Sequence, residues 1–387
     1  MRIAYLIHHV SRRAAGVLEV VKAQARELAQ RGHTVMVFGY DPPNEPPGSG
    51  TDWQDLPVRS TGTWLSIPQG YSPRLERWIA EFRPDILHTH GIWTGLSLSS
   101  LRARASTGAQ LVISPHGMLD PWALRHRSIK KRVAGFLFER RHLAHARLLQ
   151  ALTPAEATDL RALDLPGRIA IVPNGVDLPK PDRAGPAQAG LVRAGLARAP
   201  WGPSPRRRVL LFLGRIHEKK GVFDLVDAFE RLAPVLSEWR LVIAGFGEPK
   251  DEARLRERLR SASASEFIGR QGPDARHLCY ACADVFVLPS HSEGLPMTVL
   301  EAWSHEKPAL ISPACHLDIG QSVGAALPIL PDAEGLAAGL RALGTLTDEE
   351  LALRGRAAGV LVRAEYSWSR IGAQLEHEYR ELLVEPQ

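Results

Sequence analysis

The stretch ADVFVLPSHSEGLPMTVLEAWSHE, residues 283–306, contains a strand, a loop and a helix in immediate succession. Its first eight residues are mostly apolar, as in a strand that is buried on both faces of a parallel sheet. Pro296 stands where the first helical turn begins, a position at which its missing N–H costs little. The order of strand, loop and helix is typical of a parallel α/β domain.

The same alternation extends through the second half of the chain. Three further segments predict strands, and one predicts a helix between the first two of them. The strands are RRRVLLFLGRI (206–216), WRLVIAGFG (239–247) and SEFIGRQG (265–272), and the helix is GVFDLVDAFERLAPVL (221–236). We therefore expect a doubly wound α/β domain in this half.

The first half repeats this design. Strands are predicted at MRIAYLIHHV (1–10), HTVMVFGYD (33–41), RPDILHTHG (83–91) and QLVISPHG (110–117), and a helix at VLEVVKAQARELAQRG (17–32). Two of these strands end in histidine, at His90 and His116. Ligands of open α/β sheets bind at the carboxyl ends of the strands, so both histidines are candidates for a site.

A chain of 387 residues is too long for one ordinary core, which indicates two domains and a cleft between them. The segment GRIAIVPNGVDLPKP (167–181) and the Ala-, Pro- and Gly-rich residues up to Pro205 are typical of an interdomain connection. The expected parts are an acceptor-binding domain, a linker, a nucleotide-binding domain and a final helix returning to the first domain. Their expected bounds are 1–178, 179–206, 207–365 and 366–387.

The composition argues for a cytoplasmic protein that does not cross a membrane. Three cysteines, Cys279, Cys282 and Cys315, are too few for a disulfide framework, and the N-terminus does not resemble a cleavable signal peptide. No apolar run approaches the roughly 20 residues that span a bilayer. Cys279 and Cys282 have no second pair with which to hold zinc, so packing is the expected role of both.

The net charge of +6 is concentrated in RHRSIKKRVAGFLFERRHLAHAR, residues 125–147. Cations around apolar residues are the pattern of a basic helix that lies on an anionic membrane surface, on the cytoplasmic side. An ordinary helix with one solvated face gives the same pattern. Nucleic acid would also be attracted to such a run, but we expect no nucleic-acid partner because the second half contains a more specific set of motifs.

Two of these motifs suit a diphosphate. In GRIHEKKG (214–221), Arg215 and Lys220 follow a strand and can neutralise phosphate charge at its carboxyl end. Gly214 begins the motif. In AGFG (244–247), Gly245 and Gly247 let the backbone approach a ligand closely.

Two carboxylates flank the start of the helix after residue 296. Glu293 lies in the loop, followed by Gly294 and Leu295, and Glu301 lies inside the helix. Helical rise and a short loop place the carboxylates roughly 10 to 15 Å apart. Glycosidase carboxylates lie at most about 9.5 Å apart, so this pair indicates contacts at the two ends of a long ligand, such as a sugar joined to a nucleotide. The helix N-terminus between them is a natural phosphate site.

These motifs resemble those of the retaining glycosyltransferase family 4, the group 1 glycosyl transferases, over nearly the whole chain. The family pattern G-R-(I/L)-x-x-x-K-G corresponds to residues 214–221, and its two glutamates eight residues apart correspond to Glu293 and Glu301. Asn174–Asp177 and Ala283–Ser290 match further family segments. The resemblance implies the GT-B fold, two Rossmann-like domains facing each other across a cleft.

The family's site roles can be transferred to the matching residues. The resemblance implies that Arg215 and Lys220 bind the donor diphosphate and stabilise the leaving nucleotide. It implies that Glu293 holds sugar hydroxyls at the reacting face and that Glu301 holds the ribose. The donor-binding set is then Gly16, Gly214, Arg215, Lys220, Gly245, Gly247, Glu293, Gly294, Leu295 and Glu301, and the catalytic set is His116, Glu293, Arg215 and Lys220.

The amino-terminal half departs from the family at one point. Where the family has a Gly-Gly turn, this chain has Ala14, Ala15 and Gly16, and the methyl group of Ala15 would crowd the site. The family histidine near the sugar matches His116, which we favour over His90; both of these and Trp93 are candidates on the acceptor side. His88 and His90 are expected on opposite faces of their strand, which would prevent one metal ion from binding both.

The resemblance implies a hexosyl transfer with retention from a nucleotide-diphosphate sugar, most simply a UDP- or GDP-sugar, and no obligatory metal. The acceptor would be a glycan or a lipid-linked molecule of polysaccharide or lipopolysaccharide synthesis. The sequence leaves open a sugar-nucleotide epimerase, which needs no acceptor, and a glucan synthase, which needs several sugar-binding surfaces. It also leaves open a binding module without activity. The sugar, base, acceptor, linkage and oligomeric state are not predicted.

Overall fold

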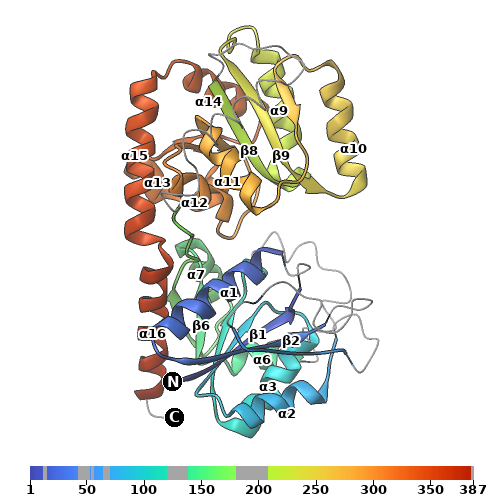
Figure 1. The fold of residues 1–387 in the computed structure, drawn as a ribbon, viewed down its shortest axis with the longest axis vertical. Helices are drawn as coiled ribbons and strands as arrows, with labels where there is room; N and C mark the ends of the chain where they lie inside the picture. The colour runs from blue at the N-terminus through green and yellow to red at the C-terminus, as the bar shows by residue number, and fades with distance from the viewer. Residues whose placement is uncertain are drawn as a thin grey trace. The chain divides into compact units, whose positions relative to one another are not determined.

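A computed structural model describes residues 1–11, 15–41, 53, 56–63, 70–119, 138–179 and 208–384. The chain forms two compact units. Unit 1 comprises Met1–Gly175 together with Trp368–Gln387, and unit 2 comprises Val176–Ser367. Each unit contains one parallel sheet with helices packed against it, so the predicted doubly wound α/β class is confirmed (Figure 1).

The sheet of unit 1 has the order β3-β2-β1-β4-β5-β6-β7. Its strands are β1 Arg2–His9, β2 Thr34–Tyr40, β3 Val58–Thr61, β4 Ile86–His90, β5 Gln110–Ser114, β6 Leu148–Ala151 and β7 Arg168–Ile171. The strand order reverses between β1 and β4. The carboxyl end of β4, where His90 lies, is therefore at the switch point that ligands of such sheets occupy.

Helices cover both faces of this sheet. They are α1 Ala15–Gln30, α2 Pro73–Phe82, α3 Gly95–Thr107, α6 Arg140–Ala144, α7 Pro154–Arg161 and α16 Trp368–Val384. Alternate residues of β1 belong to different core clusters: Leu6 packs with Leu75 of α2, and Tyr5 packs with Leu18 of α1 and Leu375 of α16. The buried inner residues of β1, 3–7, are all apolar and contribute to both cores, as the sequence predicted.

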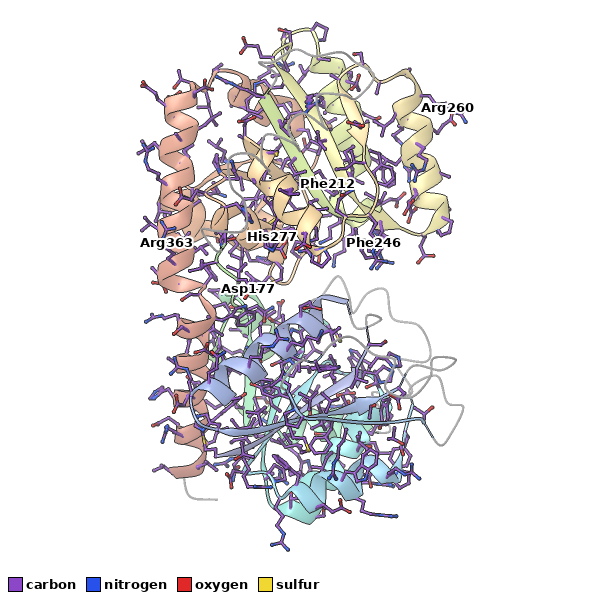
Figure 2. The ribbon with its side chains drawn as sticks, in the orientation of Figure 1. Asp177, Phe212, Phe246, Arg260, His277 and Arg363 are labelled. Carbon is purple, nitrogen blue, oxygen red and sulfur yellow. The ribbon has the colours of Figure 1, made fainter. Side chains whose placement is uncertain are left out.

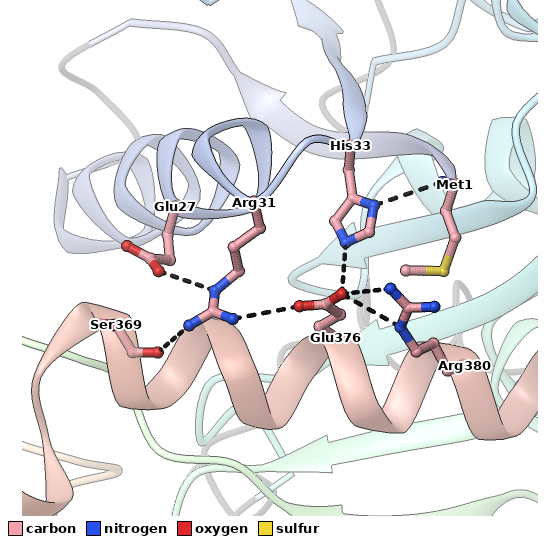
Figure 3. Close-up of polar contacts among 7 residues, drawn as sticks. All are labelled: Met1, Glu27, Arg31, His33, Ser369, Glu376 and Arg380. Atoms are coloured by element: carbon pink, nitrogen blue, oxygen red, sulfur yellow. Dashed lines mark hydrogen bonds and ion pairs between the residues drawn. The ribbon is translucent and has the colours of Figure 1, made fainter.

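Polar contacts also join α16 to α1 within unit 1 (Figure 3). Glu376 accepts a hydrogen bond from Nη1 of Arg31 at 3.2 Å and lies 3.3 Å from Nε2 of His33. Arg31 donates in addition to Glu27 at 2.9 Å and to the carbonyl of Ser369 at 2.7 Å. The last helix is therefore attached to the sheet of unit 1 by its apolar face and by this cluster.

The sheet of unit 2 has the order β10-β9-β8-β11-β12-β13. Its strands are β8 Arg208–Ile216, β9 Trp239–Gly247, β10 Ser265–Phe267, β11 Val285–Leu288, β12 Ala309–Ile311 and β13 Ala326–Pro328. The helices and single turns are η3 Glu218–Lys220, α9 Val222–Leu232, α10 Pro249–Arg258, η4 Leu259–Ser261, α11 Pro273–Cys282, α12 Met297–Ser304, η5 Pro313–Cys315, α13 Asp318–Ser322, α14 Ala333–Gly344 and α15 Asp348–Glu365. The order reverses between β8 and β11, whose following loops contain Lys220 and Glu293.

The interpretation of residues 167–181 as a connection is wrong for Arg168–Ile171, which forms the edge strand β7. The strand is short and no residue of it is fully buried, so it lacks the apolar run that marks the inner strands. Most of the predicted linker, residues 180–206, lies outside the described residues.

The basic run 125–147 is described only from residue 138 onward. In that part, Glu139 and His142 are fully buried and joined by a hydrogen bond of 2.9 Å, and Leu143 belongs to the core of unit 1. The prediction of a membrane-facing helix is therefore wrong for this end of the run, because its apolar side packs on the protein. Among the described residues, no helix is long and apolar enough to cross a membrane.

Candidate functional site

The first part of the candidate site is the turn after β8, which contains Lys220. Lys220 ends the short η3 turn, which His217 caps by accepting a hydrogen bond from the backbone N–H of Lys219. Gly221 then starts α9 with φ +67°, and a Cβ at this position would lie 2.2 Å from the carbonyl oxygen of Pro289. Only glycine permits this close approach of the turn to β11.

The approach brings Lys220 to Glu293. Nζ of Lys220 lies 2.5 Å from Oε1 of Glu293, and the hydroxyl of Ser290 donates to the same oxygen at 2.6 Å. Among the described residues, both side-chain hydrogen bonds of Glu293 therefore end at Oε1. The Glu293 side chain is 8% exposed and that of Lys220 is 23% exposed, so the pair is largely removed from water.

A second layer of contacts holds this pair in place, and the sequence analysis did not find it. Ser312 donates to the carbonyl of Ser290 at 2.6 Å, and the backbone N–H of His291 donates to the carbonyl of Lys219 at 2.8 Å. Burial, together with the charge of Glu293, raises the pKa of the Cys315 thiol to about 12, so this cysteine stays protonated. Single serines and a cysteine in loops have no periodicity that would have identified them.

Arg215 occupies the penultimate position of β8 and remains accessible. Its side chain is 56% exposed, and its nearest carboxylate, Glu248, is 3.7 Å away, a weak surface pair. Gly214 pairs in register with Gly245, and Arg215 with Phe246 at the end of β9, labelled in Figure 2. Gly245 has φ +148°, and a Cβ there would lie 1.8 Å from the carbonyl of Gly214. The structure thus gives Gly245 a packing reason, the close pairing of β8 and β9, whereas the close approach of this backbone to a ligand stays a prediction.

Glu301 lies on α12 and receives two hydrogen bonds from α11. Arg276 donates to Oε1, and the hydroxyl of Tyr280 donates to Oε2 at 2.6 Å. His277, between these two donors in the sequence, is labelled in Figure 2. The sequence analysis identified Glu301 but neither donor, because nothing local in PDARHLCYAC predicts contact with a residue in another helix.

The helix N-terminus between the two glutamates is present as predicted. Pro296 is the N-cap of α12, and its side chain cannot accept a hydrogen bond from the first turn. Gly294 is half-buried and Leu295 is buried immediately before it. The positive end of the helix dipole therefore adjoins the loop that contains Glu293, a favourable place for an anion.

In unit 1, His88, His90 and His116 lie in contact at β4 and the carboxyl end of β5, and the rings of His90 and His116 are stacked. Nδ1 of His90 lies 2.9 Å from Nε2 of His116, and the rings of His88 and His90 are 4.2 Å apart. The expectation that His88 and His90 point to opposite faces is wrong, because residues two apart in a strand share a face. Burial lowers the pKa of His116 from 6.5 to about 4, so this ring is neutral at neutral pH.

The backbone at these strand ends is unusual. His116 has φ +54° and Trp93 has φ +69°, both in the left-handed region that non-glycine residues seldom occupy. Two buried carboxylates hold the adjacent loops. Glu139 accepts from the backbone N–H of Trp93 at 2.7 Å, and Glu156 accepts from that of Gly117 at 2.7 Å. Such strain at a strand end is typical of functional sites.

Neither carboxylate was predicted, although one had a signal. Glu156 is the third residue after Thr153, the arrangement of a capping box, and Thr153 does cap α7. The Glu156 side chain instead binds the backbone N–H groups of Gly117 and Leu152. Glu139 follows Phe138 and precedes Arg140 and Arg141 in the sequence, and no local pattern there indicates a buried carboxylate.

Gly16 lies in the first turn of α1. It is exposed, and no atom lies within 4 Å of the place where its Cβ would stand. Ala14 and the side chain of Ala15 lie outside the described residues, so the predicted crowding by the Ala15 methyl group stays a prediction. Within the described ranges, no group of three or more His, Cys, Asp or Glu residues is placed to hold a metal ion.

Comparisons with family models cover both units. A model described as "Glycosyl transferase 4-like domain" matches residues 15–175, and one described as "Glycosyl transferases group 1" matches residues 207–345. The second match contains Arg215, Lys220, Glu293 and Glu301, and the first contains His116.

Two relatives share the name GDP-mannose:cellobiosyl-diphosphopolyprenol alpha-mannosyltransferase. The one from Xanthomonas oryzae pv. oryzae is 24% identical over 397 residues, which cover 100% of this chain and 98% of that protein. The one from Xanthomonas campestris is 27% identical over 224 residues, which cover 57% of this chain and 53% of that protein.

Solved structures of the same fold cover nearly the whole chain. Sucrose-phosphate synthase from Thermosynechococcus elongatus aligns with a TM-score of 0.77 at 21% identity, over 99% of both chains. HepE from Anabaena, solved in complex with UDP and glucose, aligns with a TM-score of 0.76 at 17% identity, over 98% of this chain and 100% of that chain. These likenesses establish the GT-B fold that the sequence resemblance implied.

Proposed function

The chain belongs to glycosyltransferase family 4, the group 1 glycosyl transferases, and we propose that it moves a hexose from a UDP- or GDP-sugar to a glycan or lipid-linked acceptor with retention. The observation that carries the proposal is the set of groups at the β8 and β11 strand ends of unit 2. Arg215 is accessible, Lys220 is paired with Glu293, and the α12 N-terminus adjoins them.

These groups suit a leaving nucleoside diphosphate. Negative charge develops on the diphosphate as the sugar departs, and two cations with a helix N-terminus stabilise it in the transition state. Lys220 has three N–H donors, so it can contact phosphate while it remains bonded to Glu293. This electrostatic set is the basis for expecting no obligatory metal.

Glu293 is suited to hold the transferred sugar. Lys220 and Ser290 both bond Oε1, which leaves Oε2 as an acceptor for sugar hydroxyls. Gly294 and Leu295 follow in the same loop, and the carboxylate can orient the sugar next to the diphosphate. Proximity and orientation of this kind contribute to the rate without a covalent intermediate.

On the acceptor side we propose His116, with His90 and Trp93 as its neighbours. The neutral His116 ring can donate or accept one hydrogen bond to a sugar hydroxyl through the nitrogen that His90 does not use.

A UDP- or GDP-sugar is proposed because HepE binds UDP and the Xanthomonas relatives are named for GDP-mannose. The relatives' diphosphopolyprenol acceptor supports a lipid-linked acceptor, and with it polysaccharide or lipopolysaccharide synthesis. Such an acceptor lies in a membrane, so we propose a peripheral position on the cytoplasmic face.

A transfer assay tests this proposal. The protein is incubated with a UDP- or GDP-hexose and a polyprenyl-diphosphate-linked disaccharide, and nucleotide release is followed. Proton NMR of the product gives the anomeric configuration of the new bond. We expect nucleotide release that depends on the acceptor, and a product with the anomeric configuration of the donor. An inverted product contradicts retention, and conversion of the donor sugar without an acceptor indicates an epimerase.

A further inference from the structure

The carboxylate of Glu301 is held at both oxygens by one neighbouring helix. Arg276 donates to Oε1 and Tyr280 donates to Oε2 at 2.6 Å. These donors are four residues apart on α11, so they share one face of that helix. A glutamate side chain has three rotatable bonds, and one donor at each oxygen fixes the plane of its carboxylate.

Tyr280 is itself held firmly. It is 1% exposed, and its ring centroid lies 5.5 Å from that of His305 and 5.9 Å from that of Phe286. Burial, followed by the charge of Glu301, raises the pKa of Tyr280 well above its ordinary value. The hydroxyl therefore stays protonated at all physiological pH values and acts as a donor.

The held carboxylate retains capacity for a ligand. An ionised carboxylate has about four acceptor positions, of which Arg276 and Tyr280 use one on each oxygen. The Glu301 side chain remains 23% exposed. What binds there must donate two hydrogen bonds to two fixed oxygens, and a pair of adjacent hydroxyl groups does this. A ribose has such a pair at its 2′ and 3′ positions, and a 2′-deoxyribose does not.

We propose that Arg276 and Tyr280 are positioning residues that give the donor site its selectivity for ribose over 2′-deoxyribose. They act through Glu301, by presenting its two oxygens to the 2′ and 3′ hydroxyls in one orientation. The inference rests on the proposed function, because it takes the ligand of Glu301 to be the ribose of a nucleoside diphosphate.

If Glu301 only joins α11 to α12, a different result is expected. In that case Arg276 and Tyr280 affect stability, and a change at either affects all ligands of the unit to the same degree. The ratio of the affinities for a ribonucleotide and its deoxy counterpart separates the two explanations, because a general loss of structure does not alter it.

The experiment is isothermal titration of the full chain with UDP, dUDP, GDP and dGDP. We expect the wild type to bind UDP or GDP at least about tenfold more tightly than the deoxy form, since a site built to bond a hydroxyl rejects an analogue that lacks it. Tyr280→Phe removes one donor without changing the ring, and it should weaken ribonucleotide binding about tenfold while changing the deoxy form less than about twofold.

Two further variants complete the test. Arg276→Lys keeps a cation but loses the guanidinium geometry, and it should lower the selectivity ratio by an intermediate amount. His277→Ala is the matched control, because His277 is an exposed residue of the same helix that bonds His305 at 3.1 Å instead of Glu301; it should leave the ratio unchanged.

An unchanged ratio in both Tyr280→Phe and Arg276→Lys, with ribonucleotide binding still measurable, overturns this inference and leaves the proposed donor site intact. A wild type that binds the ribo and deoxy forms equally overturns it as well. A wild type that binds none of the four nucleotides overturns the proposed function, and this inference with it.

Discussion

At the scale of single residues, Lys220 and Glu293 form the most consequential ion pair of unit 2. Their atoms approach to 2.5 Å although 73 residues separate them in the chain. Because Glu293 is only 8% exposed, removal of its cation leaves a carboxylate that water can barely reach. The pair therefore has a structural role in addition to the chemistry proposed for it.

Lys220→Met should lower the stability of unit 2 by about 2 kcal/mol, because a buried charged group loses a partner. This corresponds to a fall in Tm of about 4 to 8 °C for a domain of this size. The matched control is Arg254→Met, which breaks an exposed pair with Glu218 and should cost less than about 1 kcal/mol. Calorimetry measures the stability of both variants. Equal losses would contradict the prediction, because they would show that the Lys220–Glu293 pair stabilises the protein no more than a surface ion pair does.

His116 carries a prediction on pH. Burial lowers its folded pKa to about 4, below the 6.5 of an exposed histidine. The unfolded chain then binds more protons than the folded one between these values, so the stability from this group is complete above pH 6.5 and is lost as pH falls through 4. His116→Asn tolerates the φ of +54° and does not titrate. Its Tm should depend less on pH between 7 and 4 than that of the wild type; parallel curves would contradict this.

Which residues the sequence could identify at this scale depends on how local their role is. Arg215, Lys220 and Glu293 lie at or after the ends of predicted strands, so their positions could be inferred. Glu301 lies inside a predicted helix, and its position could be inferred as well. Arg276 and Tyr280 act across 25 and 21 residues on a different helix, and no local pattern encodes that contact. The wrong prediction for His88 and His90 has another origin: residues two apart in a strand lie on the same face, and the prediction placed them on opposite faces.

At the scale of elements, the turn from β8 to α9 depends on one glycine. Gly221 has φ +67°, and its missing side chain makes room for the carbonyl of Pro289. Gly324 has a similar φ of +79° but only the end of the Arg354 side chain, 3.9 Å away, near its Cβ position. Substitutions at the two positions therefore separate the energetic cost of the left-handed φ from the cost of the steric contact with Pro289.

Gly221→Ala should cost about 3 kcal/mol or more, because the new methyl group displaces β11 from the Lys220 turn. Gly324→Ala should cost about 1 kcal/mol, the ordinary penalty of the left-handed conformation. Urea unfolding of both variants provides the comparison. If Gly324→Ala is as destabilising as Gly221→Ala, the close approach of Gly221 to Pro289 is not the cause of the stability loss in Gly221→Ala.

The helix α16 is attached to its sheet by a buried chain of hydrogen bonds. Gln150 donates to the carbonyl of Val172, and Ser114 donates to Gln150, so Ser114 must accept from Nε2 of His88. Nδ1 of His88 is then an acceptor for the hydroxyl of Tyr379, at 2.6 Å. The direction of each bond follows from the amide of Gln150.

Tyr379→Phe should therefore lower the stability of unit 1 by about 1 to 3 kcal/mol, because Nδ1 of His88 is left buried without a donor. Arg380→Ala on the same helix removes an exposed ion pair, made of two hydrogen bonds to Glu376, and should have an effect below about 0.5 kcal/mol. Thermal unfolding followed by circular dichroism distinguishes them. A Tyr379→Phe variant as stable as Arg380→Ala would mean that the chain of bonds does not support the helix.

Elements were predictable in proportion to their apolar character. The predicted strands and helices have continuous apolar runs or helical periodicity, and the structure contains each of them. The short inner strands β6 and β12 and the long helix α15 were not predicted. The edge strand β7 was missed because partial exposure leaves RIAI without that pattern. The short turns η3 and α6 depend on tertiary contacts, such as the burial of Glu139 and His142. Local helix propensities do not indicate such contacts.

At the scale of the whole molecule, two sheets of similar design have different side chains at their strand ends. The strand ends of unit 1 present the stacked, neutral rings of His90 and His116, whereas those of unit 2 present an accessible arginine and a lysine–glutamate pair. The fold class was predictable because buried parallel strands and alternating helices are local signals. The contact between His88 and Tyr379, 291 residues apart, is not a local signal.

Unit 2 is proposed to bind the nucleotide part of a sugar donor, and stabilisation of the protein against heat by nucleotide sugars measures this binding. The full chain is heated with UDP-, GDP-, ADP- and dTDP-sugars, alongside Arg215→Ala and Glu301→Ala. At about 100 times the Kd, one ligand should raise the Tm of the wild type by about 5 to 10 °C, and neither variant should show this rise. No rise with any of the four nucleotide sugars, or an equal rise in both variants, would contradict the account.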